Sequence, residues 1–241
     1  MGDCQAQRIP LEFRGFPRVF LFVELSNGLG KWLEAMEHKG RIGQVPWNPA
    51  VPVWTAWDIG VSDSTAIWFL QPDGRGWNAI DYEEASGAGM SFYAKLLKEK
   101  PYVYQEHMGP HDPAVQEFGS GKTRLETARE LAIDFLLAPR LSVEEGIEAV
   151  RNLLPRLWID RSRCSRALEG LLDYRYTWDE SLRIFSKPPF HSWSSRACDS
   201  LRMFATSDLD TDGDHTEPPP NGNTIRSPTG LRQRCGRLVA A

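Results

Sequence analysis

The sequence predicts an α/β fold in which a central mixed β-sheet is flanked by helices. Three apolar segments separated by short turns lie between residues 53 and 83, a pattern typical of sequential antiparallel strands. From residue 102 onwards, strand-like segments alternate with amphipathic helical patterns, which favours the α/β class. The length of 241 residues allows a sizeable core and favours one domain with extensions.

The N-terminal part is predicted to contain a helix over residues 26–39. Its shared apolar face consists of Leu29, Trp32, Leu33 and Met36. Gly40 would end this helix, and the Gly- and Pro-containing residues 41–52 are interpreted as a linker. We therefore expect an N-terminal extension at 1–50, the folded domain at 51–206 and a disordered tail at 207–241.

The folded domain is predicted to begin with three strands, at 53–59, 66–69 and 77–83. The elements expected after them are a helix at 91–100, a strand beginning at 102, a helix at 123–131, a strand at 133–138, and helices at 143–154, 164–174 and 192–205. The helix at 91–100 is expected to turn Phe92, Leu96 and Leu97 inward.

Charge and cysteine content restrict the function classes. The formal net charge is -4 and the sequence pI is about 5.8, so no global positive field attracts nucleic acid, although metal ions and local Arg residues can neutralise phosphates. The four cysteines form no CxxC pair, which argues against a zinc ribbon or a disulfide framework and favours a reducing, cytoplasmic setting. No signal pattern and no apolar stretch of ~20 residues is present, so no membrane association is expected.

Carboxylates follow two of the predicted strands. Asp58 ends the first strand and Asp112 follows the fourth, while Asp199 lies on the last helix. This order of elements is the layout of ribonuclease-H-like nucleases, in which the first and fourth strands are neighbours, so the first two carboxylates would meet. Hard divalent ions such as Mg²⁺ prefer such oxygen ligands.

At these residues the chain resembles the C-terminal nuclease domain of the large terminase subunit of tailed bacteriophages and prophages. The resemblance covers about residues 39–205. The segments that carry it are Gly40-Arg41-Ile42-Gly43, Val45-Pro46-Trp47, Thr55-Ala56-Trp57-Asp58-Ile59-Gly60, Asp63-Ser64-Thr65-Ala66-Ile67-Trp68, Pro110-His111-Asp112, the run from Gly121 to Ala128, and His191-Ser192-Trp193-Ser194-Ser195 leading to Asp199.

The resemblance implies a metal-dependent DNA endonuclease with the ligands Asp58, Asp112 and Asp199 and with two Mg²⁺ or Mn²⁺ ions. Asp58 would bridge both ions, and the other two carboxylates would each hold one. Such an enzyme cuts concatemeric double-stranded DNA during genome packaging in the cytoplasm of the bacterial host. Possible further residues, next to the ligands or in contact with DNA, are His111, Lys122, Arg124, His191 and Arg196, the last at the position where the family has His.

A complete large terminase also carries an ATPase motor, and residues 1–50 are too few to contain one. We therefore expect no ATPase in this chain, which would be a fragment, a split gene or a decayed prophage copy. Partners implied by the family are the portal protein, the small terminase subunit and a separate ATPase chain. Two alternatives remain open: a catalytically impaired packaging module, and a ribonuclease-H-like resolvase that needs no motor.

Several other polar patterns have a structural interpretation. Asp63 is expected to serve a turn, and Asp81 with Glu83 to form a solvated strand face. The Gly-rich residues 119–123 lack the first glycine of a phosphate-binding loop, and the acidic run at 208–214 lacks the final Glu of a calcium loop. The arginines between 151 and 175 alternate with carboxylates, so they form either a salt-bridged surface or a DNA-facing patch.

Overall fold

The computed structural model describes residues 28–60, 64–111, 122–174, 176, 178–179, 184–185 and 193–207. The helices are α1 (Gly30–His38), α2 (Met90–Glu99), α3 (Arg124–Glu130), α4 (Val143–Leu153), α5 (Ser165–Asp173) and α6 (Ser195–Ala205), with a 3-10 turn at Leu154–Arg156. The strands of the main sheet are β1 (Ile42–Gly43), β2 (Val53–Ile59), β3 (Ser64–Pro72), β4 (Trp77–Ser86), β5 (Tyr104–Gly109), β6 (Phe135–Leu137) and β7 (Leu157–Asp160). A separate short pair is formed by β8 (Trp178–Asp179) and β9 (Ile184–Phe185).

The main sheet is mixed and has the order β1-β7-β4-β3-β2-β5-β6. β3 is antiparallel to both β2 and β4, while the pairs β2–β5, β5–β6, β4–β7 and β1–β7 are parallel. The predicted meander is therefore confirmed, and so is the adjacency of the first and fourth predicted strands, β2 and β5. Because only β3 runs the other way, the other six strands all end at the same edge of the sheet.

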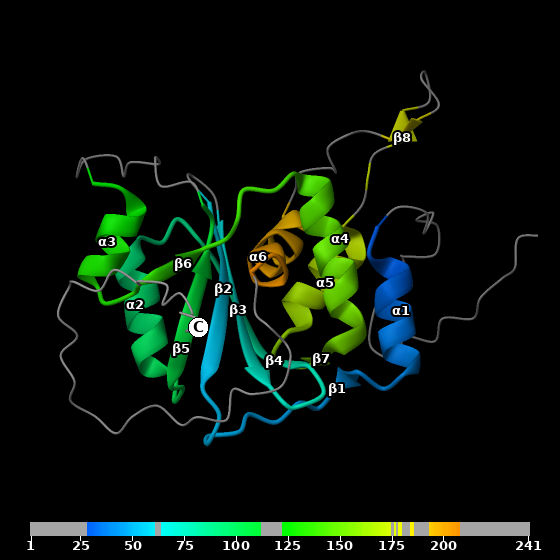
Figure 1. Cartoon of the computed structure of the whole chain (residues 1–241), viewed down its shortest axis with the longest axis horizontal. Helices are drawn as coiled ribbons and strands as arrows, with labels where there is room; N and C mark the ends of the chain where they lie inside the picture. The colour runs from blue at the N-terminus through cyan, green and yellow to red at the C-terminus, as the bar shows by residue number, and fades with distance from the viewer. Residues whose placement is uncertain are drawn as a thin grey trace, which may run out of the picture. The chain divides into compact units, whose positions relative to one another are not determined.

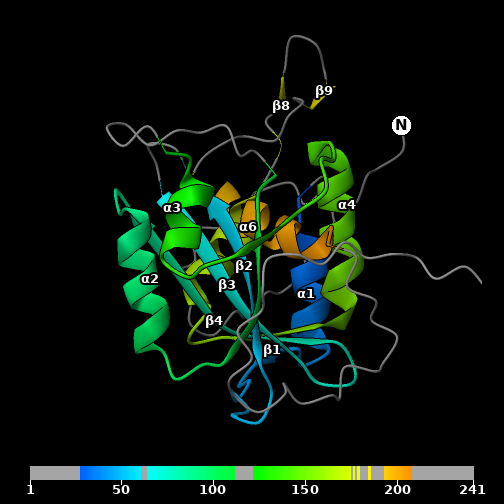
Figure 2. The same cartoon turned by 60° about the vertical axis from the view of Figure 1, so that its left-hand side comes forward.

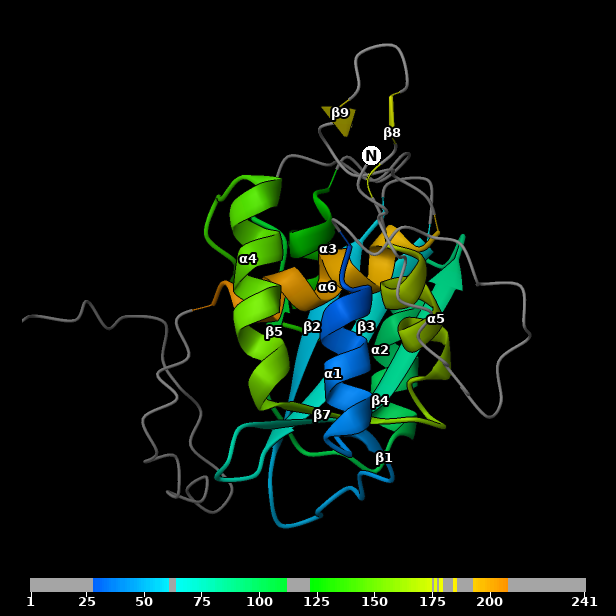
Figure 3. The ribbon, with the colours of Figure 1, turned by 90° about the vertical axis from the view of Figure 1, so that its right-hand side faces the viewer.

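Helices cover both faces of this sheet (Figure 1). Side chains alternate along a strand, so Trp54 and Ala56 of β2 enter the core with α1, α4, α5 and α6, while Val53 and Trp57 enter the core with α2 and α3. Figure 2 shows α2 and α3 next to each other on their face, and Figure 3 shows α1, α4 and α5 on the other. Burial on both faces explains the nearly continuous apolar sequence of β2 and β3.

The structure corrects the predicted faces of two helices. In α2, Phe92 is 46% exposed, and the buried residues are Met90, Tyr93, Ala94 and Leu97, which follow the i, i+3, i+4, i+7 spacing of one helical face. In α1, Trp32 is also exposed, while Leu29, Leu33 and Met36 are buried. Part of the predicted linker at 41–52 is strand β1, which pairs with β7. Neither of these strands was predicted, because they are too short to show alternation.

Side chains cap two helices in the same way. The Thr123 side chain accepts a hydrogen bond from the backbone N–H of Glu126, whose carboxylate binds back to Thr123, and Ser142 and Glu145 repeat this capping box at α4. Thr123 thus begins α3 as an N-cap residue, as the prediction of a helix opening there requires. Of the helices in the described part of the chain, none has the length and apolar character needed to cross a membrane.

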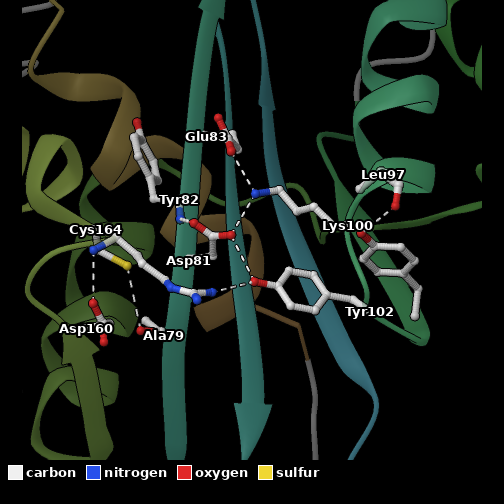
Figure 4. A network of polar contacts seen from close by, with 11 residues as sticks. Ala79, Asp81, Tyr82, Glu83, Leu97, Lys100, Tyr102, Asp160 and Cys164 are labelled. Atoms are coloured by element: carbon white, nitrogen blue, oxygen red, sulfur yellow. Dashed lines mark hydrogen bonds and ion pairs between the residues drawn. The ribbon is translucent and has the colours of Figure 1, made fainter. Parts of the chain in front are cut away.

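The prediction that Asp81 lies on a solvated face is wrong. Asp81 is buried, and its Oδ2 accepts from Lys100 Nζ at 2.6 Å and from the Tyr102 hydroxyl at 2.9 Å (Figure 4). Lys100 also binds Glu83 Oε1 at 2.7 Å. The reason is tertiary: the chain after α2 passes next to β4, so a carboxylate that looks exposed in sequence becomes the partner of a half-buried ammonium group.

Candidate functional site

Asp58 lies near the carboxyl end of β2, the strand between β3 and β5. Its Cα pairs with Ala66 of β3, and its position in the strand puts its side chain on the same sheet face as Trp54 and Ala56. This is the face that α6 covers. The residue is half-buried, whereas Val53–Trp57 before it are buried. Asp58 thus places a carboxylate at the sheet edge where six strands end.

The parallel neighbour β5 ends beside it. Ala56 pairs with Met108, so the chain that follows Gly109 leaves the sheet at the level of Asp58. His111 lies there in a bend and is half-buried. Asp112 and His191 lie outside the described residues, so the meeting of Asp58 with Asp112 stays a prediction.

Helix α6 lies across β2 and β3 and also contacts α4 and α5 (Figures 1 and 3). Its direction is fixed by two contacts: Trp68 Nε1 donates to the carbonyl of Ala197 at 2.8 Å, and the ring of Phe204 packs against Trp77 with centroids 4.6 Å apart. Trp68 pairs with Ala56 near the end of β2, while Trp77 begins β4 at the other edge. The N-terminal half of α6, which contains Asp199, therefore lies at the edge that carries Asp58.

Asp199 lies on α6 and interacts within the helix. Its Oδ1 accepts a hydrogen bond from Arg202 Nη1 at 2.6 Å, and its side chain is 19% exposed. Arg202 follows Asp199 by three residues, so this contact joins neighbours on one face of the helix. Arg202 in turn packs against Gly146 of α4, since a Cβ atom at that glycine would lie 2.6 Å from Arg202 Nε.

Arg196 extends toward the sheet instead. Its Nη1 donates to Ser64 Oγ on β3 and to Glu84 Oε1 on β4, the latter at 3.2 Å. Glu84 was not among the predicted site residues. Its position two residues after Tyr82 on β4 places Glu84 on the sheet face that α6 covers, and this spacing is visible in the sequence. Its contact with Arg196 is visible only in the tertiary fold.

The electrostatic surroundings of Tyr82 show that Glu84 and Asp58 both lie near its hydroxyl group. The Tyr82 hydroxyl donates to Glu84 Oε2 at 2.9 Å. Burial first, then the charge and hydrogen bond of Glu84 and the charge of Asp58, raise the pKa of Tyr82 far above its ordinary value. Tyr82 therefore stays protonated and acts as a hydrogen-bond donor near both carboxylates.

Two predicted DNA contacts have intramolecular partners in the structure. Arg124 Nη1 donates to the backbone carbonyl of Ile59 at 3.1 Å and to that of Gly60, so it holds the chain directly after Asp58. Lys122 binds Glu130 at 2.6 Å on the surface. Arg124 thus connects the start of α3 to the end of the strand that carries Asp58.

The chemistry of the predicted donor set fits a hard divalent cation, because it consists of carboxylate oxygens without thiolate or imidazole. Within the described ranges, no three His, Cys, Asp or Glu residues form a group that could hold a metal ion, and Asp112 is not in those ranges. The structure thus positions Asp58 and the helix that bears Asp199, but not the third carboxylate.

Comparisons of sequence gave no relatives: no protein-family model and no curated protein matches the chain. Comparisons of structure gave several. The nuclease domain of the P22 large terminase matches with a TM-score of 0.52 at 19% identity, over 68% of this chain and 84% of that domain. The large terminase nuclease of thermophilic phage G20c with bound cobalt matches with a TM-score of 0.51 at 16% identity, over 76% of this chain and 99% of that one.

A longer large terminase, from another thermophilic bacteriophage and in complex with ATP-γ-S, matches with a TM-score of 0.56 at 15% identity. The match covers 74% of this chain and 45% of that terminase, so the chain spans less than half of its length. At these identities the likeness concerns the fold. This chain has the ribonuclease-H-like fold found in the nuclease domains of large terminases.

Proposed function

We propose that this chain is a terminase-type nuclease module that cuts the DNA phosphodiester backbone with the help of divalent metal ions. The observation that carries the proposal is the position of Asp58: it lies near the carboxyl end of β2, next to parallel β5, on the face covered by α6. The structural likeness to large terminase nucleases, one of which was solved with bound cobalt, supports it.

In this proposal, Asp58, Asp112 and Asp199 hold the metal ions, which are Mg²⁺ or Mn²⁺. Two bound ions would supply the positive charge that activates water and stabilises the leaving 3′ oxygen. The chain itself positions the carboxylates: β2 fixes Asp58, and Arg124 binds the carbonyls of Ile59 and Gly60 that follow it. Arg202 orients Asp199 through its 2.6 Å hydrogen bond.

The substrate class that follows is double-stranded DNA, cut during packaging in the bacterial cytoplasm. The terminase that was solved with ATP-γ-S is more than twice as long as its region matched by this chain. The proposed partners of this chain are therefore an ATPase motor, the portal protein and the small terminase subunit. The chain contacts them only if it works within such an assembly.

Nicking of supercoiled plasmid DNA tests the proposal. The wild type is expected to nick with Mn²⁺ or Mg²⁺ and not with EDTA, and Asp58→Asn is expected to remove nicking while its thermal unfolding midpoint stays close to that of the wild type. Asp134→Asn is the matched control, because Asp134 is 79% exposed and precedes β6 at the opposite edge of the sheet. Equal nicking by wild type and Asp58→Asn would show that the cutting site is elsewhere.

One observation favours a second candidate, a packaging module that does not cut. The Arg196 guanidinium lies next to the strand that bears Asp58, and a fixed cation competes with divalent ions for nearby carboxylates. Isothermal titration with Mn²⁺ separates the two candidates. The nuclease requires binding that Asp58→Asn weakens, whereas absence of binding by the wild type supports the non-catalytic module.

A further inference from the structure

Glu84 contacts side chains from its own strand β4 and from the helices α5 and α6. Its carboxylate accepts a hydrogen bond from the Tyr82 hydroxyl at 2.9 Å and pairs with Arg196 Nη1 at 3.2 Å. Arg166 Nε of α5 lies 3.9 Å from its second oxygen. Only 12% of the Glu84 side chain is exposed, and Arg196 is equally covered. A carboxylate that accepts two hydrogen bonds and lies near a further cation in a poorly solvated place holds its partners in fixed positions.

The strand register places this group beside Asp58. Asp58 of β2 pairs with Ala66 of β3, and Ala66 pairs with Glu84 of β4, so the two carboxylates stand in one row across three strands. Neighbouring strands lie about 4.8 Å apart. Arg196 also binds Ser64, which is two residues before Ala66 and on the same face of β3. Its guanidinium therefore lies over β3, between the strand of Asp58 and the strand of Glu84.

We propose that Glu84 is a positioning residue, which holds Arg196 beside Asp58 so that Arg196 contacts a phosphate of the DNA backbone. This inference rests on the proposed nuclease function. The guanidinium is always charged, and its planar fork matches phosphate oxygens. The chain as a whole has a net charge of -4, so DNA at this edge needs local cations of this kind.

The phosphate contact is tested without metal and without cleavage. Binding of a fluorescent DNA duplex is measured in EDTA at several salt concentrations. Loss of one phosphate contact lowers the magnitude of the slope of log K against log salt by about 0.9, which is the result expected for Arg196→Ala. Arg129→Ala is the control, because Arg129 is 72% exposed and pairs with Asp134. An unchanged slope for Arg196→Ala would overturn the contact.

The positioning role is tested by a double-mutant cycle on the Mn²⁺-dependent nicking rate. Misplacement of a group near the reacting atoms costs on the order of 10- to 100-fold, so Glu84→Gln should lower kcat by that factor. In an Arg196→Ala background the same change should have less than about a twofold effect, since Glu84 acts through Arg196. The positioning role would be overturned if the losses in kcat of the two single variants multiplied in the double variant. It would also be overturned if Glu84→Gln kept the wild-type kcat.

The neighbouring residue provides the matched control. Glu83 lies next to Glu84 on β4 but binds Lys100, so Glu83→Gln should keep the wild-type kcat. Titration of Glu84→Gln with Mn²⁺ should give wild-type affinity, and a loss of binding would make Glu84 a metal ligand instead of a positioning residue. If Glu84→Gln does not fold, Ser64→Ala removes the second partner of Arg196 without changing a charge and should lower kcat in the same direction.

The two levels of the proposal fail in different ways. A wild type that never nicks DNA with any divalent ion contradicts the nuclease function, and the salt slope of Arg196→Ala still reports on the contact. A wild type that nicks, with Glu84→Gln equal to it, contradicts only the positioning role.

Discussion

Arg196 and Glu84 are 112 residues apart in sequence and form an ion pair of 3.2 Å on the face of the sheet that α6 covers. Together with the hydrogen bond from Trp68 to the carbonyl of Ala197, this pair ties the N-terminal end of α6 to β3 and β4. Because Asp199 lies one turn further along the same helix, its position relative to Asp58 depends on these contacts. The position of Asp199 thus depends on residues that are not themselves predicted ligands.

His107 gives the fold an acid-sensitive point. Burial lowers the pKa of His107 from 6.5 to about 4, and its Nδ1 lies 2.6 Å from Thr55 Oγ1. The unfolded chain binds the proton near pH 6.5 and the folded chain only near pH 4, so the contribution of neutral His107 is complete above pH 6.5 and is lost as the pH falls toward 4. Urea unfolding of wild type and His107→Gln at pH 7, 5 and 4 should show a difference that changes by roughly 3 kcal/mol. A pH-independent difference would contradict this.

The cluster around Asp81 is expected to contribute strongly to stability. Asp81→Asn would leave the ammonium group of Lys100, 16% exposed, without its closest charged partner in the interior. Lys100 keeps Glu83 as a charged partner, so the expected cost is that of a lost charge-assisted hydrogen bond in a poorly solvated place, about 1.5–3 kcal/mol. Glu83→Gln affects the same lysine, but Glu83 is 38% exposed and should cost at most about 1 kcal/mol. Denaturation midpoints of the two variants are the measurement, and equal losses would argue against the buried role of Asp81.

Residues near one another in sequence were predicted well. The antiparallel meander and the start of α3 at Thr123 both follow from local spacing, and the adjacency of β2 and β5 followed from the ribonuclease-H-like order of the elements. Contacts such as Arg196 with Glu84 could not be predicted, because they depend on how α6 crosses the sheet. The burial of Asp81 was missed for the same reason. The role of Asp112 as a metal ligand stays a prediction.

Gly146 of α4 is predicted to control the orientation of Arg202. A Cβ at this position would lie 2.6 Å from Arg202 Nε, a buried atom for which the described contacts contain no hydrogen-bond acceptor. Gly146→Ala should therefore displace Arg202 and cost about 1–3 kcal/mol by overpacking. In an Arg202→Ala background the clash is absent, and Gly146→Ala should instead stabilise by up to about 1 kcal/mol through helix propensity. A destabilisation of the same size in both backgrounds would show that other neighbours cause the clash.

Arg124 is predicted to hold the strand end that carries Asp58. Arg124→Met removes the donor to the carbonyls of Ile59 and Gly60, so hydrogen exchange in a peptide covering residues 53–60 should become faster. Lys122→Met is the control, because Lys122 binds Glu130 on the surface and should leave exchange in that peptide unchanged. The sequence suggested instead that Arg124 contacts a DNA phosphate. In that case Arg124→Met should reduce the salt dependence of DNA binding and leave the hydrogen exchange of residues 53–60 unchanged. Faster exchange for Arg124→Met alone would identify a residue that fixes the position of Asp58 from the other face of the sheet.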